Sequence, residues 1–349
     1  MKIIPITLKK KLDDSHKIYI GNDLEKEIYS FLSKAKIGNK YAIISDSKVA
    51  RLYAPTLKRE LKKAGINAEI FSFKEGEQEK KLENLEKLAN EMLAKNFDRK
   101  DAIIALGGGV VGDLGGFLAS IYMRGIPFIQ IPTTLLAMVD ASVGGKTGVD
   151  LKMGKNLLGT FNQPKAVFID TNYLKTLPQK QIRNGLAEII KYGIIKDAKL
   201  FELIEKNLDK ILKLDEELLN KIIIRSVEIK AEVVMADEKE AGERMILNYG
   251  HTYGHAIEKM SGYTLLHGYA ISIGMVIANK MAVEKKLLSP KDAERIKTLI
   301  HKTGLPITIM KKPQMKDLMN DKKKMGGHIN FILPTKIGKV IIHPEPCQQ

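Results

Sequence analysis

Four side chains in the second half of the chain could hold a metal ion. His251 and His255 are four residues apart, so on a helix both imidazoles would lie on one face. His267 begins a further expected helix, and Glu188 lies in an earlier one. Two histidines and one glutamate make a donor set that leaves a coordination position open for a substrate oxygen. A purely structural role for the histidines is the alternative reading.

Two familiar catalytic patterns are absent. A zinc-protease HExxH motif would need glutamate where Thr252 stands. The stretch SVGGKT at residues 142–147 ends like a P-loop, but Asp140 occupies the place of the glycine that a P-loop needs six residues before its lysine. Three side chains in this glycine-rich region still suit an anion, unless it is a solvated surface loop: Lys146, Lys155 and Asn156.

A glycine-rich turn follows an apolar run at residues 102–106. The sequence GGGVVGD at residues 107–113 would let the backbone approach a phosphate at a helix N-terminus, which favours dinucleotide binding. The alternative is a turn that only packs a helix onto a sheet. Further on, Lys191 follows Glu188 by three residues in apolar surroundings, which favours a buried pair. Lys230 and Arg244 also lie on expected helical elements, although ordinary surface positions would explain them.

The elements that must position these groups fall into two kinds. Short apolar strands at residues 41–44, 67–73, 102–106 and 127–131 alternate with helices, one ending near residue 63 and one at residues 82–96. This alternation predicts a Rossmann-like, mostly parallel sheet with helices on both faces. From residue 182 to about 303 the periodicity is helical, and β-like pieces follow at 328–333 and 338–342. We therefore expect an α/β domain at 1–174, an α-helical domain at 175–349, and a ligand site between them.

Composition narrows the class of protein. The net charge of +16 fits a lysine-rich surface or attraction of small anions, while lysines spread along the chain with no recognisable module argue against nucleic-acid binding. Cys347 is the only cysteine, so disulfides and cysteine-based metal clusters within the chain are excluded, and a cytoplasmic location is expected. The uncharged stretch 260–279 contains several polar residues and is read as a buried helix, not a membrane span.

Most of the chain, from about residue 41 to 334, resembles the 3-dehydroquinate synthase family of the sugar-phosphate cyclases. The most specific tracts are RGIPFIQIPTTLLAMVDASVGGKT (124–147) and NYGHTYGHAIE (248–258), supported by EGEQ (75–78), GKN (154–156) and LAEIIK (186–191). The resemblance implies NAD in the N-terminal domain and a divalent metal, most often zinc with cobalt as the other option, on Glu188, His251 and His267.

The resemblance also assigns the remaining site residues. Matches to cofactor contacts are Asp46, Glu75, Gly76, Glu77, Gln78, Lys80, Gly109, Val110, Val111, Gly112, Asp113, Thr133, Thr134, Lys146, Lys155, Tyr173, Leu174, Lys175 and Thr176. Matches to substrate contacts are Asp140, Lys146, Asn156, Lys191, Lys230, Arg244, Asn248, His255 and one of Lys322 and Lys323. Arg124 matches an arginine that enters the neighbouring subunit's site, which implies a homodimer.

The implied reaction starts from a small anionic seven-carbon sugar-acid phosphate. NAD accepts hydride from a ring carbinol whose oxygen the metal polarises, phosphate is eliminated, the hydride returns, and an aldol step closes the carbocycle. One departure from the family pattern is Tyr269, where relatives usually carry glutamate. The rivals are a cyclase that makes an inosose or a valiolone, an iron-type alcohol dehydrogenase, and a non-enzymatic anion-binding protein.

Overall fold

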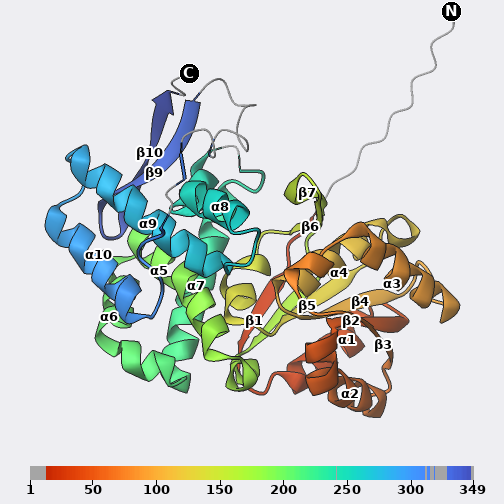
Figure 1. The fold of residues 1–349 in the computed structure, drawn as a ribbon. Helices are drawn as coiled ribbons and strands as arrows, with labels where there is room; N and C mark the ends of the chain where they lie inside the picture. The colour runs from red at the N-terminus through yellow and green to blue at the C-terminus, as the bar shows by residue number, and fades with distance from the viewer. Residues whose placement is uncertain (1–12, 241, 311–312, 315–317, 319–327, 347–349) are drawn as a thin grey trace, which may run out of the picture.

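A six-stranded parallel sheet forms the first half of the computed structural model, which describes residues 13–240, 242–310, 313, 314, 318 and 328–346. The strand order is β1-β8-β5-β4-β2-β3, and every pairing is parallel (Figure 1). The strands are β1 (Lys17–Gly21), β2 (Lys40–Asp46), β3 (Asn67–Phe73), β4 (Ala102–Gly107), β5 (Phe128–Pro132) and β8 (Ala166–Asp170). Because all strands run the same way, their carboxyl ends and the turns that follow them lie along one edge.

Helices cover both faces of this sheet, as the alternation of elements predicts. Alternate residues of β2 and β4 point to opposite sides, so Ile43 and Ile104 pack with α1 (Glu25–Ala35) and α2 (Ser47–Lys63). Ile44 and Ile103 pack on the other side with α3 (Leu82–Ala94) and α4 (Gly109–Ile121). The sheet is therefore buried on both faces, which explains its continuous apolar strands.

The second half is helical. Its helices are α5 (Gln179–Ile195), α6 (Ala198–Leu212), α7 (Glu216–Ala236), α8 (His251–Met260), α9 (His267–Glu284) and α10 (Pro290–Lys302), followed by the antiparallel strands β9 (His328–Lys336) and β10 (Lys339–Pro346). One hydrophobic cluster joins Leu135, Val139 and Ile169 of the sheet region to the helices. Within the described residues, no helix is both long and apolar enough to cross a membrane.

The predicted strands and helices are confirmed, with differences at their ends. Ser45 and Asp46 were expected in a turn but complete β2, and Asp46 then caps α2 by accepting from the amides of Lys48 and Val49 at 2.9 and 3.0 Å. Four strands were not predicted: β1, β8 and the antiparallel hairpin of β6 (Lys146–Leu151) and β7 (Gly154–Phe161). Strand β1 is partly exposed at the edge of the sheet, and its apolar run, residues 18–20, is too short to signal a strand by itself.

Candidate active site

Three helices bring the expected metal ligands together. Glu188 lies in the middle of α5, and His251 and His267 are the first residues of α8 and α9. The Nε2 atoms of His251 and His267 lie 3.3 and 3.2 Å from the same Oε1 atom of Glu188. One donor atom from each residue falls within 4.8 Å of the others. This nitrogen, nitrogen and oxygen set fits a zinc-like divalent ion.

The charges around this group are strongly coupled. Burial would raise the pKa of the Glu188 carboxyl, but Lys191 and the two imidazoles hold it well below its usual range. Burial and the nearby Lys191 charge lower the pKa of His251. Burial acts the same way on His267, but its contacts with Glu188 and Glu258 outweigh it and raise its pKa to about 10. The charges of Lys191 and protonated His267 balance those of Glu188 and Glu258, so a bound cation would take the place of the His267 proton.

Both histidine ligands are held through their second ring nitrogen. His251 Nδ1 lies 3.1 Å from the carbonyl oxygen of Tyr249, and His267 Nδ1 lies 3.4 Å from Glu258 Oε2. Such contacts fix which ring nitrogen faces the metal. Glu258 was not among the expected site residues, although it follows His251 and His255 on the same face of α8 at the next helical position.

The expected phosphate-binding turn leads from β4 into the N-terminus of α4. Gly108 caps α4, and a Cβ atom on Gly107 would meet the Val111 side chain at 2.4 Å. Beside the turn, the Thr133 hydroxyl is buried and has no hydrogen-bond partner among the described residues. A narrow cavity lies at this point, lined by Ala105, Gly107, Gly108, Gly109, Gly112, Gln130, Pro132, Ala137, Ala141 and Ser142. The helix N-terminus and the unpaired Thr133 hydroxyl suit a phosphate group, while the Gly107 position shows how closely α4 packs on β4.

A buried ion pair lies next to the glycine turn. The Lys80 ammonium contacts the carboxylate of Asp113 and the side-chain oxygen of Asn156. Burial opposes the charge of Lys80, but Asp113 and Glu77 raise its pKa, so it stays protonated. Asn156 was expected at the substrate. Its contact with Lys80 places it at the junction of the cofactor residues and the β6–β7 hairpin.

Other expected cofactor residues line the carboxyl edge of the sheet. Asp46 ends β2, and residues 75–78 form a tight turn after β3 in which Gly76 has a φ of 120°. Residues 173–176 follow β8, where the Tyr173 ring packs edge-on against Tyr53 at 4.8 Å. Leu174 and Val111 have buried side chains, so only their backbones remain to contact a cofactor.

The expected substrate cations are each paired with an oxygen. Lys230 contacts the Asp140 side chain, which also accepts from Tyr192 at 3.2 Å. Lys146 contacts Glu240, whose other oxygen accepts from Asn248 Nδ2 at 2.7 Å. Tyr192 and Glu240 were not among the predicted site residues, since Asp140 and Lys146, which they contact, lie 52 and 94 residues away in the sequence.

Two further residues expected to contact the substrate, Arg244 and His255, lie beside the metal ligands and the paired lysines. Arg244 is buried and donates to the carbonyl oxygen of Glu238. The His255 ring is exposed, with its centroid 5.4 Å from that of His251. Lys322 and Lys323 lie outside the described residues.

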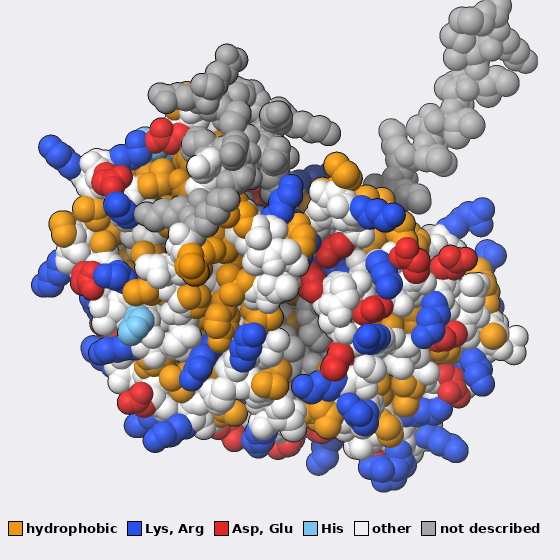
Figure 2. Space-filling model, in the orientation of Figure 1, with side chains coloured by type: hydrophobic (Ala, Val, Ile, Leu, Met, Phe, Trp, Pro, Cys, Tyr) orange, Lys and Arg blue, Asp and Glu red, His pale blue; other side chains and the backbone are white. Residues whose placement is uncertain are grey.

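Arg124 stands apart from this group. It is exposed after α4 with a φ of 70°, and its side chain makes no hydrogen bond or ion pair within the described part of the chain. On the face shown in Figure 2, lysine and arginine side chains are scattered and do not form one continuous patch.

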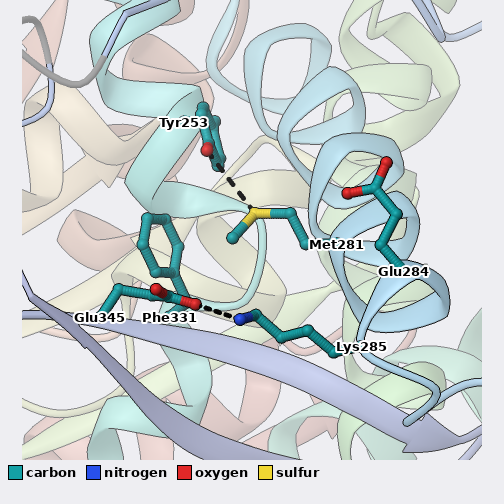
Figure 3. A pocket seen from close by; sticks show the side chains of 6 residues that line it. All are labelled: Tyr253, Met281, Glu284, Lys285, Phe331 and Glu345. Atoms are coloured by element: carbon teal, nitrogen blue, oxygen red, sulfur yellow. Dashed lines mark hydrogen bonds and ion pairs between the residues drawn. The ribbon is translucent and has the colours of Figure 1, made fainter.

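A larger cavity of about 320 Å³ lies elsewhere, between α8, α9 and the β9–β10 hairpin. Figure 3 shows Tyr253 donating to Met281 Sδ at 3.5 Å, and Lys285 paired with Glu345. Glu284 and Phe331 complete the lining. None of the expected metal, cofactor or substrate residues lines this cavity, so its size does not make it the reaction site.

Solved structures with the same architecture define the class. A 2-epi-5-epi-valiolone synthase from Streptomyces hygroscopicus subsp. jinggangensis, with NAD+ and Zn2+ bound, matches with a TM-score of 0.88 and 27% identity over 98% of this chain and 95% of its own. A 2-deoxy-scyllo-inosose synthase complexed with carbaglucose-6-phosphate, NAD+ and Co2+ matches with a TM-score of 0.85 and 29% identity, over 94% of this chain and 93% of its own. An iron-containing alcohol dehydrogenase shares only the fold, with a TM-score of 0.65 and 18% identity over 88% of this chain and 90% of its own. The chain has the fold of the sugar-phosphate cyclases.

Sequence comparison narrows the class to one family. The 3-dehydroquinate synthase N-terminal model matches residues 70–184, and the C-terminal model matches residues 185–325. A 3-dehydroquinate synthase of Desulforamulus reducens is 46% identical over 95% of this chain and 94% of its own length. A 3-dehydroquinate synthase of Prochlorococcus marinus subsp. pastoris is 49% identical over 95% of this chain and 93% of its own length. The chain belongs to the 3-dehydroquinate synthase family.

Proposed function

We propose that this chain converts 3-deoxy-D-arabino-heptulosonate 7-phosphate to 3-dehydroquinate and inorganic phosphate, a step of the shikimate pathway that leads to aromatic amino acids. The observation that carries the proposal is the Glu188–His251–His267 group, whose carboxylate is buried and whose histidines are partly buried, near the cations Lys191 and Lys230. Membership of the 3-dehydroquinate synthase family supports the choice of substrate.

The two bound groups would sit on the residues that fit them. When bound, NAD supplies a reversible hydride acceptor and zinc or cobalt supplies a Lewis acid for a substrate oxygen. Glu188, His251 and His267 would hold the metal, and the backbone of residues 109–113 with Thr133 and Thr134 would hold the cofactor phosphates. Asp113, in the first turn and a half of α4, is paired with the buried Lys80.

The remaining residues of the chain bind and orient the substrate. Its carboxylate and phosphate need cations, which Lys146, Lys230 and Arg244 supply. Lys146 and Lys230 are already held by the carboxylates Glu240 and Asp140. Positions fixed in this way lower the entropic cost of aligning the reacting atoms. The exposed ring of His255 is placed to contact phosphate or to carry a proton at the rim of the site.

We also propose that the working unit is a homodimer in which Arg124 enters the partner's site. Large apolar side chains are exposed next to Arg124 in the sequence and on the β6–β7 hairpin, which meets the end of α4 where Thr160 donates to Ser120 at 2.9 Å. Soluble monomers seldom expose many such side chains in one region. The exposed residues are Ile121, Met123, Leu151, Met153, Leu157, Leu158 and Phe161. A second copy of the chain would cover them and bring Arg124 to a substrate. In each protomer, we place the boundary between the α/β and helical domains near residue 175.

A substrate panel tests the reaction. The zinc-loaded protein with NAD would be given the heptulosonate phosphate, a heptulose phosphate without the carboxylate, and glucose 6-phosphate in separate assays. Release of phosphate only from the heptulosonate phosphate supports the proposal. Release only from either of the other two would move the chain to the valiolone or inosose reactions and contradict it.

A further inference from the structure

Glu258 is a buried carboxylate at the centre of the site to which the proposed mechanism assigns no role. Glu258 lies on α8 and is only 3% exposed. Both oxygens are engaged: Oε2 lies 3.4 Å from His267 Nδ1, and Oε1 lies 3.3 Å from Lys155 Nζ. Because buried carboxylates are costly unless paired, this placement calls for a specific function.

The contact with His267 determines how that ring can bind a metal. Its Nε2 atom faces Glu188, so a metal there needs Nε2 unprotonated and the ring proton on Nδ1. A carboxylate beside Nδ1 accepts that proton in a hydrogen bond, fixes the ring orientation and makes Nε2 a stronger donor. Among the described residues, Glu258 is the side chain that contacts this Nδ1 atom.

The contact with Lys155 reaches the other half of the molecule. Lys155 lies on β7, its ammonium is 3.2 Å from Glu77 Oε1, and it stands over the Tyr263 ring at 4.8 Å. Glu77 belongs to the turn after β3 at the edge of the sheet. Glu258 therefore joins α8, which carries a metal ligand, to residues assigned to the dinucleotide.

We propose that Glu258 is a positioning residue that orients His267 for the metal and Lys155 for the dinucleotide, and so couples the two sites. This inference rests on the proposed assignment of those sites. His255, Glu258 and His267 also have donor atoms within 4.8 Å, as a second cation site would require. The Lys155 ammonium already occupies Glu258 Oε1, however, and its positive charge would repel a second cation there.

The test compares Glu258→Gln with Glu240→Gln, since both replace a buried or half-buried carboxylate but Glu240 contacts no proposed metal ligand. Zinc affinity would be measured by competition with a chromophoric chelator, and NAD affinity by calorimetry. We expect Glu258→Gln to weaken zinc roughly 10- to 100-fold and to weaken NAD as well. Glu240→Gln should leave zinc affinity unchanged. Lys155→Met should weaken NAD and, because it leaves Glu258 without its lysine partner, should shift zinc affinity by less than Glu258→Gln does.

Unchanged zinc affinity in Glu258→Gln would overturn the inference. So would a wild-type titration with two zinc ions of which Glu258→Gln loses one, because Glu258 would then be a ligand. A thermal unfolding midpoint within a few degrees of wild type, measured on each variant, separates lost positioning from lost folding. A wild-type protein that binds zinc but releases no phosphate would contradict the proposed function and leave the role of Glu258 intact.

Discussion

Lys191 and Glu188 form an ion pair one helical turn apart on α5, with side chains only 1% and 0% exposed. The pair keeps the Glu188 carboxyl ionised, since the lysine charge helps to hold its pKa well below the usual range despite burial. A metal ligand is thereby held in its charged form by a neighbour that is also assigned to the substrate. The pair links protein stability to metal binding.

Replacing Lys191 by methionine should destabilise the metal-free protein by roughly 3 kcal/mol, because the buried Glu188 carboxylate would lose its lysine partner and keep only the two histidines. Zinc should recover much of this loss by supplying positive charge at the same carboxylate. Urea unfolding of metal-free and zinc-loaded protein measures both effects. Lys221→Met, which breaks an exposed pair with Glu217, should change stability by about 0.5 kcal/mol or less. An equal loss with and without zinc would contradict this explanation.

The glycine turn allows a second prediction. A methyl group on Gly107 would overlap Val111, so Gly107→Ala should displace the turn and weaken NAD binding by roughly tenfold or more. Gly21 provides a control, because it also ends a strand of the sheet but has room, with its nearest neighbour Leu24 at 3.4 Å. Calorimetry should show near-normal NAD affinity for Gly21→Ala. Normal affinity in Gly107→Ala would show that the turn does not carry the cofactor phosphate.

Asp197 predicts a pH-dependent contribution to stability. Burial acts against its charge, but the hydrogen bond from Arg225 Nε at 2.6 Å and those from the amides of Lys199 and Leu200 lower its pKa. Because folding lowers its pKa, ionised Asp197 stabilises the fold at pH values above 3.8, the pKa in the unfolded chain. This contribution is lost as the pH falls through the lower pKa of the folded state.

The variant Asp197→Asn keeps an acceptor for the helix cap but loses the charge. It should therefore be about 1–2 kcal/mol less stable than wild type at pH 7. Urea unfolding between pH 7 and pH 3 should show the difference shrinking as the solution is acidified. Asp209→Asn, on the exposed face of α6, should show no such trend. A difference that stays constant with pH would refute the role of the charge.

Arg124 allows the dimer to be tested by complementation. Arg124→Ala and Glu188→Gln should each be inactive alone. In a mixed dimer, one site would have an intact Glu188 and receive Arg124 from its partner. After exchange of equal amounts, activity should return to about a quarter of wild type, because half the dimers are mixed and each has one intact site. No recovery, despite exchange verified by mass, would contradict the shared site.

Local patterns in the sequence predicted much of this arrangement. The shared face of His251 and His255 and the three-residue step from Glu188 to Lys191 are confirmed, since helical periodicity determines both. The expected start of a helix at His267 is also confirmed. The continuous apolar strands likewise predicted a sheet buried on both faces.

The sequence did not reveal contacts between distant segments. Lys155 and Glu258 are 103 residues apart and meet only because the β6–β7 hairpin lies against α8. Lys146 reaches Glu240 across 94 residues in the same way. Strand β1 pairs with β8, which follows it by about 150 positions, so neither strand has a local signal for its partner.

The most direct measurement follows inorganic phosphate and NADH together after the heptulosonate phosphate is added to the zinc-loaded protein with NAD. Stoichiometric phosphate release without lasting NADH, abolished by a chelator, restored by zinc and absent in Glu188→Gln, is the expected result. Steady accumulation of NADH would instead indicate a dehydrogenase. Phosphate release that persists after chelation or in Glu188→Gln would contradict the metal site at the centre of this account.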